Sequence, residues 1–303
     1  MKTPVKLGVF VLTLLVVFGA AWGVGWLAGP RTTPATAEPE HGQQHDTPAE
    51  PATAGKVPGG LQISQDGYRL ELAAKQLSTA GEKPLSFRII GPDGKPVTAY
   101  TNEHEKDLHL IVVRRDLTGF QHVHPVLGAD GLWSVPLKVA APGPYRVFAD
   151  FKPAAQDTGL ILGADINVPG DFQPSTLPPR TESSDGEYAV TLEGDLVPGT
   201  SSKLTLTVSK GGKPVTDLQP YLGAFGHLVA LRDGDLAYLH VHPQESTAAG
   251  PQIVFYAEVP SAGGYGLFLD FQHEGRVHTV SFTATTAGIT PAPIGTKSPG
   301  HGH

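Results

Sequence analysis

Residues 145–151 read YRVFADF and residues 265–271 read YGLFLDF, so the two stretches share a tyrosine, a phenylalanine and a closing Asp-Phe. Apolar and aromatic residues in runs of this length are typical of buried β-strands. Each run also contains one aspartate, Asp150 or Asp270, and a carboxylate among apolar side chains needs a partner. The two stretches therefore predict a β fold that is present twice in the chain.

The duplication extends upstream of these strands. The run LSFRI at 85–89 is followed by GKPVT at 94–98, and LTLTV at 204–208 is followed by GKPVT at 212–216. Short alternating runs separated by Gly, Pro and Asp turns are typical of antiparallel β-sandwiches. We therefore expect an all-β protein with two tandem immunoglobulin-like antiparallel β-sandwiches after an N-terminal transmembrane helix. The strand runs expected in the first repeat are 68–72, 85–90, 108–113, 133–139 and 145–151.

Shifts in composition divide the chain into six segments. Residues 29–58 are rich in Pro, Ala and Thr and have no hydrophobic periodicity, as expected of a disordered tether, and a similar composition ends the chain. The expected segments are an N-terminal anchor at 1–28, the tether at 29–58, repeat 1 at 59–170, a linker at 171–187, repeat 2 at 188–287 and a disordered tail at 288–303.

The N-terminal segment predicts the compartment. Residues 7–28 form a run of 22 residues without a charged side chain, which is long enough to span a bilayer. Lys2 and Lys6 precede the run, so the positive-inside rule places the N-terminus in the cytoplasm and the body outside it. The small residues at 19–21 leave a cleaved signal peptide open as an alternative. Both interpretations make the body extracytoplasmic, and the first makes the chain a single-pass protein of the cell membrane.

Composition excludes several classes of function. The 303 residues include 22 Lys and Arg against 29 Asp and Glu, a net charge of -7, so no nucleic-acid partner is expected. There is no cysteine, and the one methionine is the first residue. Disulfides and thiolate sites are therefore excluded, and the folded part has no thioether ligand. Imidazole and carboxylate remain, and these donors suit Zn(II), Cu(II) or Ni(II).

Histidines recur with the same spacing in the two repeats. In each, one histidine precedes a His-x-His pair by 13 and 15 residues, and a proline follows the pair. Side chains at i and i+2 on a strand share one face, and a hairpin brings the leading histidine onto the neighbouring strand. We therefore expect three imidazoles to converge in each repeat. The triads are His109, His122 and His124 in repeat 1, and His227, His240 and His242 in repeat 2.

The hairpin turns set the expected register. In repeat 2 the Asp233-Gly234 pair predicts a two-residue turn, which places His227 opposite His240. In repeat 1 the turn is centred at residues 115–116 or 117–118, and both choices keep the three histidines on one face. The prolines that follow each His-x-His pair indicate strands at a sheet edge, because proline cannot donate to a central ladder.

The triads indicate metal binding, since imidazole is the commonest metal ligand near neutral pH. The two strand aspartates are either fourth ligands or acceptors that orient a ligand imidazole. His104 and His278 are candidate accessory ligands, and His273 follows the second strand aspartate. A purely structural role of the histidine clusters is the competing interpretation. The predicted ligands for a divalent transition metal, Cu(II) or Zn(II), are His109, His122, His124, Asp150, His227, His240, His242 and Asp270.

The sequence from 109 to 151, HLIVVRRDLTGFQHVHPVLGADGLWSVPLKVAAPGPYRVFADF, resembles exported bacterial heavy-metal-binding β-sandwich proteins. It is also distantly similar to YtkA-like and CopC-like immunoglobulin-type modules linked to copper handling. The resemblance covers both repeats and is most specific in the His-x-His-Pro pattern. It implies a membrane-anchored protein that binds or handles metal. CopC-type sites commonly use an N-terminal amine and imidazole or methionine ligands, which this chain lacks, so copper and zinc both remain open.

These observations predict a membrane-anchored extracytoplasmic protein for metal handling or tolerance, with a membrane protein such as a metal transporter as a partner. The alternative is a tethered immunoglobulin-like interaction or structural protein. No enzymatic function is expected, because the sequence shows no general base or substrate-site signature beside the triads.

Overall fold

The structure, a computed structural model, describes residues 57–78, 82–139 and 141–286. The regular elements in these ranges are β-strands, which confirms the all-β prediction. The predicted transmembrane helix, most of the tether and the tail lie outside the described residues. Within the described ranges, no helix has the length and apolar character needed to cross a membrane.

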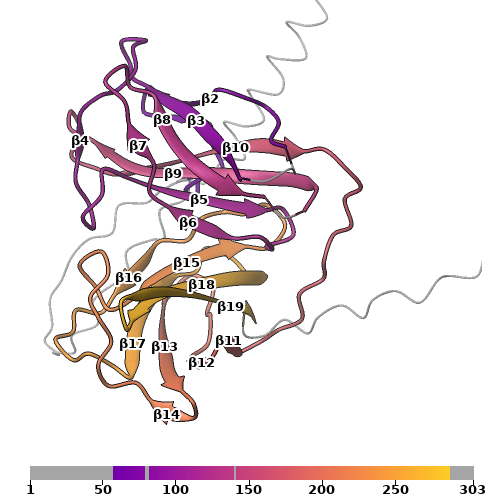
Figure 1. Ribbon diagram of the computed structural model, residues 1–303, viewed down its shortest axis with the longest axis vertical. Coiled ribbons are helices and arrows are strands. Elements are labelled where there is room, and N and C mark those ends of the chain that lie inside the picture. The colour runs from indigo at the N-terminus through magenta and orange to yellow at the C-terminus, as the bar shows by residue number, and fades with distance from the viewer. Residues whose placement is uncertain (1–56, 79–81, 140, 287–303) are drawn as a thin grey trace, which may run out of the picture. The chain divides into compact units, whose positions relative to one another are not determined.

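Repeat 1 contains two antiparallel sheets that enclose one core (Figure 1). The first sheet contains, in spatial order, β1 (Ser64–Gln65), β2 (Tyr68–Leu72), β3 (Glu82–Ile90), β8 (Trp133–Lys138) and β7 (Val126–Leu127). The second contains β10 (Leu160–Val168), β9 (Gly143–Pro153), β5 (Leu108–Arg114) and β6 (Gln121–Val123), and β4 (Tyr100–Thr101) also pairs with β9. The strands expected in this repeat are all present.

Repeat 2 has the same architecture. Its first sheet contains, in spatial order, β11 (Glu182–Asp185), β12 (Tyr188–Glu193), β13 (Ser201–Lys210), β17 (Gln252–Glu258) and β16 (Val241–Pro243), and β14 (Lys213–Pro214) also pairs with β13. Its second sheet contains β15 (His227–Arg232), β18 (Gly264–His273) and β19 (Arg276–Thr285). A separate hydrophobic core lies between these two sheets. Pro125 follows β6, and Pro243 is the last residue of β16. Both strands lie at the edge of their sheets, as the prolines indicated.

The burial pattern of the strands explains why β9 and β18 are almost wholly apolar. Strands such as β12 alternate buried and exposed residues, because one face meets the core and the other meets solvent. Most of β9 and β18 is buried on both faces. Their outer faces contribute to a third hydrophobic cluster, the junction cluster, which contains residues of both repeats. Its members are Ile111, Val113, Leu117, Phe148, Val229, Leu231, Leu236 and Phe268.

Aromatic rings make the junction cluster approximately symmetric. Phe120 of repeat 1 stacks on Phe268 of repeat 2, with ring centroids 4.0 Å apart and an interplanar angle of 2°. Tyr238 of repeat 2 meets Phe148 of repeat 1 edge to face, with centroids 5.7 Å apart. Each repeat thus supplies two rings to the junction cluster: a phenylalanine on a strand and an aromatic residue outside the strands.

The predicted two-residue turn in repeat 2 is wrong. The Arg232 amide donates to the Ala237 carbonyl, and Leu231 bridges to Tyr238, so four residues form the loop. Leu236 adopts a φ of 60° there and is fully buried in the junction cluster. Burial of this leucine favours the longer loop over the tight turn that the Asp-Gly pair predicts, since a buried leucine side chain contributes about 1.5–3 kcal/mol.

The hairpin in repeat 1 has a shorter loop of three residues, 115–117. The Arg114 amide donates to the Thr118 carbonyl, and Leu117 has a φ of 63° with its side chain buried in the junction cluster. The loop therefore lies between the two predicted turn centres, and Leu110 pairs with Val123. The predicted register shifts by two residues, an even number, so the face on which the histidines lie is unchanged.

Gly163 on β10 lies against Gly60, in the segment at the start of repeat 1 that also contacts repeat 2. A Cβ atom at Gly163 would lie 1.9 Å from the carbonyl oxygen of Gly60 and 2.9 Å from Arg146 Nε. That carbonyl accepts from the Arg146 guanidinium at 2.6 and 2.9 Å, and the neighbouring Gly59 carbonyl accepts from the Tyr238 amide of repeat 2 at 3.0 Å. Backbone must therefore move to admit any side chain at this position.

We expect Gly163→Ala to lower the free energy of unfolding by about 1–3 kcal/mol, the range for overpacked sites. Gly159→Ala is the matched control, because its nearest neighbour is a flexible carboxylate oxygen 3.3 Å away. Denaturant unfolding of the two variants measures the difference. Equal stability of both variants would contradict the close approach of Gly60 to β10.

Candidate metal centre

Three imidazoles of repeat 1 converge on the outer face of its second sheet. His109 lies on β5, and His122 and His124 lie on and just after β6. His109 Nδ1 is 3.1 Å from His122 Nε2 and 3.2 Å from His124 Nε2. The register that pairs Ile111 with His122 places the three side chains on one face, as the spacing predicted.

Hydrogen bonds show which ring nitrogens carry protons. His109 Nε2 lies 3.1 Å from the Glu103 carbonyl oxygen, and His122 Nδ1 lies 2.7 Å from Asp270 Oδ2. A carbonyl and a carboxylate only accept, so these two ring nitrogens donate. In a neutral imidazole the other nitrogen is an acceptor, so His109 Nδ1 and His122 Nε2 direct lone pairs at each other. A metal ion beside both nitrogens, or a second proton on one ring, is needed to stabilise this contact.

Burial keeps two of the three imidazoles neutral. Desolvation lowers the pKa of His109 from 6.5 to about 4, although its hydrogen bond to the Glu103 carbonyl acts in the opposite direction. Desolvation, followed by repulsion from the neighbouring imidazoles, lowers the pKa of His124 to about 3. Neutral imidazole is the form that binds a metal ion, so protons compete weakly at both ligands.

The carboxylate that orients His122 belongs to repeat 2. Asp270 lies on β18, where it pairs with His227 of β15, and its Oδ1 accepts from Thr279 Oγ1 at 2.5 Å. Its Oδ2 accepts from His122 of repeat 1. The sequence offered two roles for Asp270, and the structure places it as an acceptor behind an imidazole. The triad of one repeat is therefore held by the other.

Asp150, the counterpart of Asp270 in repeat 1, pairs with His109 across β5 and β9. Burial, and after it the Glu103 charge, raises the pKa of its carboxyl to about 7, while His122 acts in the opposite direction. Burial, and after it the charges of Asp150 and Asp270, raises the pKa of the Tyr238 hydroxyl. Asp150 is therefore a carboxyl beside the triad, in a position to gain or lose a proton near neutral pH.

Two further histidines lie around the triad. His104, on the exposed loop after β4, has its ring centroid 6.1 Å from that of His109 and 5.4 Å from that of His227. The His227 ring centroid is 6.4 Å from that of His122, and its Nε2 donates to the Tyr221 carbonyl at 2.8 Å. Desolvation lowers the pKa of His227. The rings of His104 and His227 therefore lie farther from the triad rings than the triad rings lie from one another.

The predicted triad of repeat 2 is divided between two places. His227 stays on β15, but β16 pairs with β17 of the other sheet, with Val241 opposite Ala257. In repeat 1 the chain changes sheets only after Pro125, whereas in repeat 2 it has changed by Val241. His240 and His242 consequently group with Glu258 and not with His227.

Glu258 is a candidate ligand that the sequence analysis missed. Its outward position follows from the alternation along β17, in which residues 253, 255 and 257 are buried. That signal was present in the sequence, but the pairing of β17 with β16 was not.

His273 and His278 lie in a different cluster. The Tyr188 hydroxyl is 2.8 Å from His273 Nδ1, and His273 Nε2 is 3.1 Å from Asp217 Oδ1. His278 Nδ1 is 2.7 Å from Asp185 Oδ2. Both histidines are buried and paired with carboxylates, and neither joins the triad.

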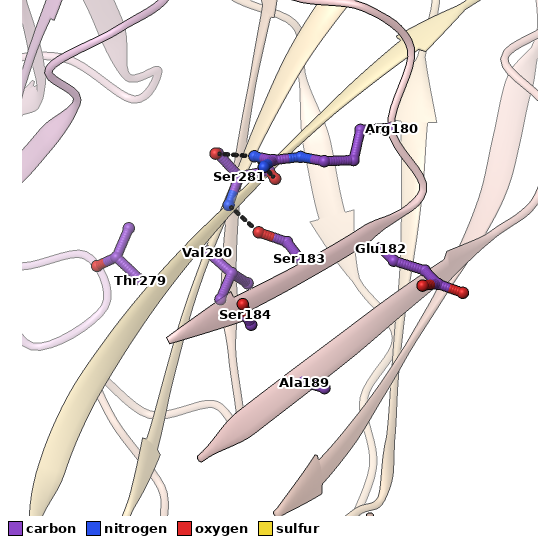
Figure 2. Close-up of a pocket in the computed structure, with 8 residues that line it drawn as sticks. All are labelled: Arg180, Glu182, Ser183, Ser184, Ala189, Thr279, Val280 and Ser281. Carbon is purple, nitrogen blue, oxygen red and sulfur yellow. Dashed lines mark hydrogen bonds between the residues drawn. The ribbon is translucent and has the colours of Figure 1, made fainter. Parts of the chain in front are cut away.

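A surface groove on repeat 2 lies away from the histidine triad and contains none of its residues. A groove of about 400 Å³ lies between β11 and β19, where Arg180 donates to the carbonyl and hydroxyl oxygens of Ser281 (Figure 2). The Ser281 amide in turn donates to Ser183 Oγ at 3.3 Å. The groove is lined mainly by serines and small residues, and the hydrogen bonds of Arg180 and Ser183 join its two walls.

The pKa shifts predict the acid response of the metal-free protein. Between pH 6.5 and about 4 the unfolded chain binds protons at His109 and His124 that the folded chain does not. The free energy of unfolding should therefore fall as the pH falls through this window. Asp150 acts in the opposite sense, because the folded chain holds its proton up to about pH 7.

We therefore expect Asp150→Asn to make the loss of stability from pH 6.5 to 4 steeper than in the unmodified chain. Urea unfolding at several pH values in the presence of a chelator measures both slopes. A slope that is unchanged or shallower in the variant would contradict the raised pKa of Asp150.

Comparison with known proteins shows the family and adds little on function. No curated protein sequence matches the chain. Among solved structures, the FdeC adhesin of Escherichia coli is 15% identical, with 74% of this chain and 65% of that chain covered and a TM-score of 0.26. Bovine butyrophilin is 12% identical, with 72% and 99% covered and a TM-score of 0.21.

The family model matches the chain twice, over residues 63–165 and 182–288, and so covers both repeats. These matches agree with the duplication that the sequence and the strand pairing show. The chain belongs to the family described as domain of unknown function (DUF8832) and carries two copies of that domain.

Proposed function

We propose that this chain is a membrane-anchored extracytoplasmic protein that binds a divalent transition metal ion, Cu(II) or Zn(II), for metal handling or tolerance. The site is the triad of His109, His122 and His124. The observation that carries the proposal is the contact between two ring nitrogens that both present lone pairs, 3.1 Å apart. A metal ion bound by both removes the repulsion that neutral imidazoles would otherwise have there.

The spacing of the triad fits a small coordination shell. Tetrahedral zinc sites have Zn–N distances of about 2.0–2.1 Å, so neighbouring ligand nitrogens are separated by about 3.3 Å. Two of the nitrogen–nitrogen distances in the triad are 3.1 and 3.2 Å. The fourth position is then available to water or to a ligand from a partner. A membrane protein such as a metal transporter is the partner we propose.

Two of the three imidazoles are already oriented by acceptors. The Glu103 carbonyl holds His109, and the Asp270 carboxylate holds His122. Such partners fix the tautomer of a ligand histidine and raise its basicity. The arrangement supports binding and release of metal, and we propose no catalytic role for it.

The second candidate is a tethered immunoglobulin-like interaction or structural protein, and one observation favours it. Within the described residues, no buried side-chain nitrogen or oxygen lacks a hydrogen-bond partner. This candidate needs a second proton on one of the two rings, so that His109 Nδ1 and His122 Nε2 share a hydrogen bond. The histidines would then join the repeats without a metal ion.

Metal retention distinguishes the two candidates. The test uses the full chain in detergent with four terminal histidines replaced by alanine, here called the reference chain; these are His41, His45, His301 and His303. After equilibration with Zn(II) or Cu(II) and dialysis, elemental analysis of the reference chain should find at least one equivalent of metal. The His109→Ala variant should bind one equivalent less. Retention of no metal by the reference chain would exclude the metal proposal and leave the structural candidate.

We expect Asp270→Asn to weaken metal binding by about 10–100-fold, the effect of removing an orienting partner of a ligand histidine. Asp185→Asn is the matched control, because Asp185 holds His278 Nδ1 at the same 2.7 Å without a role at the triad. Competition with a chelator gives both affinities. Equal affinity of the two variants would show that Asp270 does not act on the ligand set.

A further inference from the structure

We infer that His240, His242 and Glu258 form a second metal site, open to solvent and different in kind from the triad. Each residue offers one ligand atom, and these atoms all lie within 4.8 Å of one another. All three side chains are exposed. The donor set of two imidazoles and one carboxylate is one that Zn(II) uses in proteins.

Strand pairing explains how the three side chains come together. Val241 pairs with Ala257 and His242 with Tyr256, so the same register places His240 opposite Glu258. The Glu258 amide also donates to the His240 carbonyl at 3.0 Å. His242 lies on β16 and His240 directly precedes it, two residues away, so all three side chains lie on the solvent face of this sheet edge.

The two sites should differ in affinity and in exchange rate. The triad is partly buried, and a carbonyl and a carboxylate orient two of its imidazoles. The exposed site lies on an edge strand that meets solvent, with His240 and His242 rings 3.9 Å apart in a T-shaped arrangement. An exposed site with three protein ligands leaves coordination positions to water, so an incoming chelator can bind before the protein ligands leave. We therefore assign it weaker binding and faster exchange.

This inference deepens the proposed function, since a fast-exchanging site beside a slower one suits a protein that takes up or passes on metal. It does not depend on the triad, because the two sites share no ligand. The change of sheet at β16 that divides the predicted second triad is the same feature that creates the exposed site. A duplicated sequence thus gives two unlike sites.

The test follows Zn(II) release from the full-length reference chain to an excess of a coloured chelator. The reference chain should release two equivalents in two phases, and His240→Ala with His242→Ala should lose the fast phase and one equivalent. Glu258→Gln should weaken the fast site by at least about 10-fold, since loss of even an orienting partner has that effect. Glu193→Gln, which changes an exposed carboxylate on β12 of the same sheet, should alter neither phase.

The failures of the two proposals give different results. A double variant of His240 and His242 that keeps both equivalents and the fast phase would overturn the inference. A double variant of His122 and His124 should keep the fast equivalent and lose the slow one. If the slow equivalent is absent from the reference chain while the fast one is present, the proposed triad site fails and the exposed site stands.

Discussion

Replacing His122 and His124 by alanine should abolish metal binding at the triad. The variant keeps only His109 of the three ligands, so its affinity should fall by more than the roughly 10–100-fold that loss of an orienting partner causes. In elemental analysis after dialysis, the slow-exchanging equivalent should be missing. The fold should persist, because both side chains lie on or beside an edge strand outside the two sandwich cores.

The matched control is the equivalent pair of the other repeat. His240→Ala with His242→Ala removes the same His-x-His pattern but leaves the triad intact. This variant should retain the slow-exchanging equivalent with unchanged affinity. If both double variants lose the same metal, the triad and the exposed site are not separate, and the division of repeat 2 histidines by β16 would be contradicted.

Phe148→Ala should destabilise the protein by about 3–5 kcal/mol, the range for truncation of a buried phenylalanine. Phe148 is fully buried in the junction cluster and meets Tyr238 edge to face. The variant should also weaken metal binding, because the contact of Asp270 with His122 depends on the packing of the two repeats against each other. Denaturant unfolding and a chelator competition at low denaturant measure the two effects.

Phe255→Ala separates the two consequences. Phe255 is 1% exposed in the core of repeat 2 and is not a member of the junction cluster. The Phe255→Ala substitution should destabilise the protein about as much as Phe148→Ala does. The folded variant should nevertheless bind metal at the triad with nearly normal affinity. A loss of affinity as large as that of Phe148→Ala would mean that general destabilisation, and not the junction, controls the site.

Much of the fold follows from local sequence. The strands around YRVFADF and YGLFLDF and the duplication were both predicted from apolar alternation and turn residues. The common face of the repeat 1 histidines was also predicted correctly, because a register shift of two residues leaves every side chain on the same face. These are properties that neighbouring residues determine.

The features that the sequence did not predict depend on contacts between residues that are distant in the chain. The two hairpin loops, of three and four residues, arise because Leu117 and Leu236 are buried in a cluster that neither repeat forms alone. Asp150 and Asp270 were each expected to serve their own repeat, yet Asp270 holds a histidine of the other one. The departure of β16 to the opposite sheet cannot be read from its sequence, since His-Val-His-Pro is identical in both repeats.

X-ray absorption at the metal edge tests the central claim most directly. The sample is the reference chain carrying His240→Ala and His242→Ala, loaded with one equivalent of Zn(II), so that only the triad is observed. We expect about three imidazole nitrogens at about 2.0–2.1 Å and the multiple-scattering pattern of histidine rings. A shell of oxygen atoms alone, or failure to load the metal, would contradict the account and leave the His122–Asp270 contact as a purely structural link.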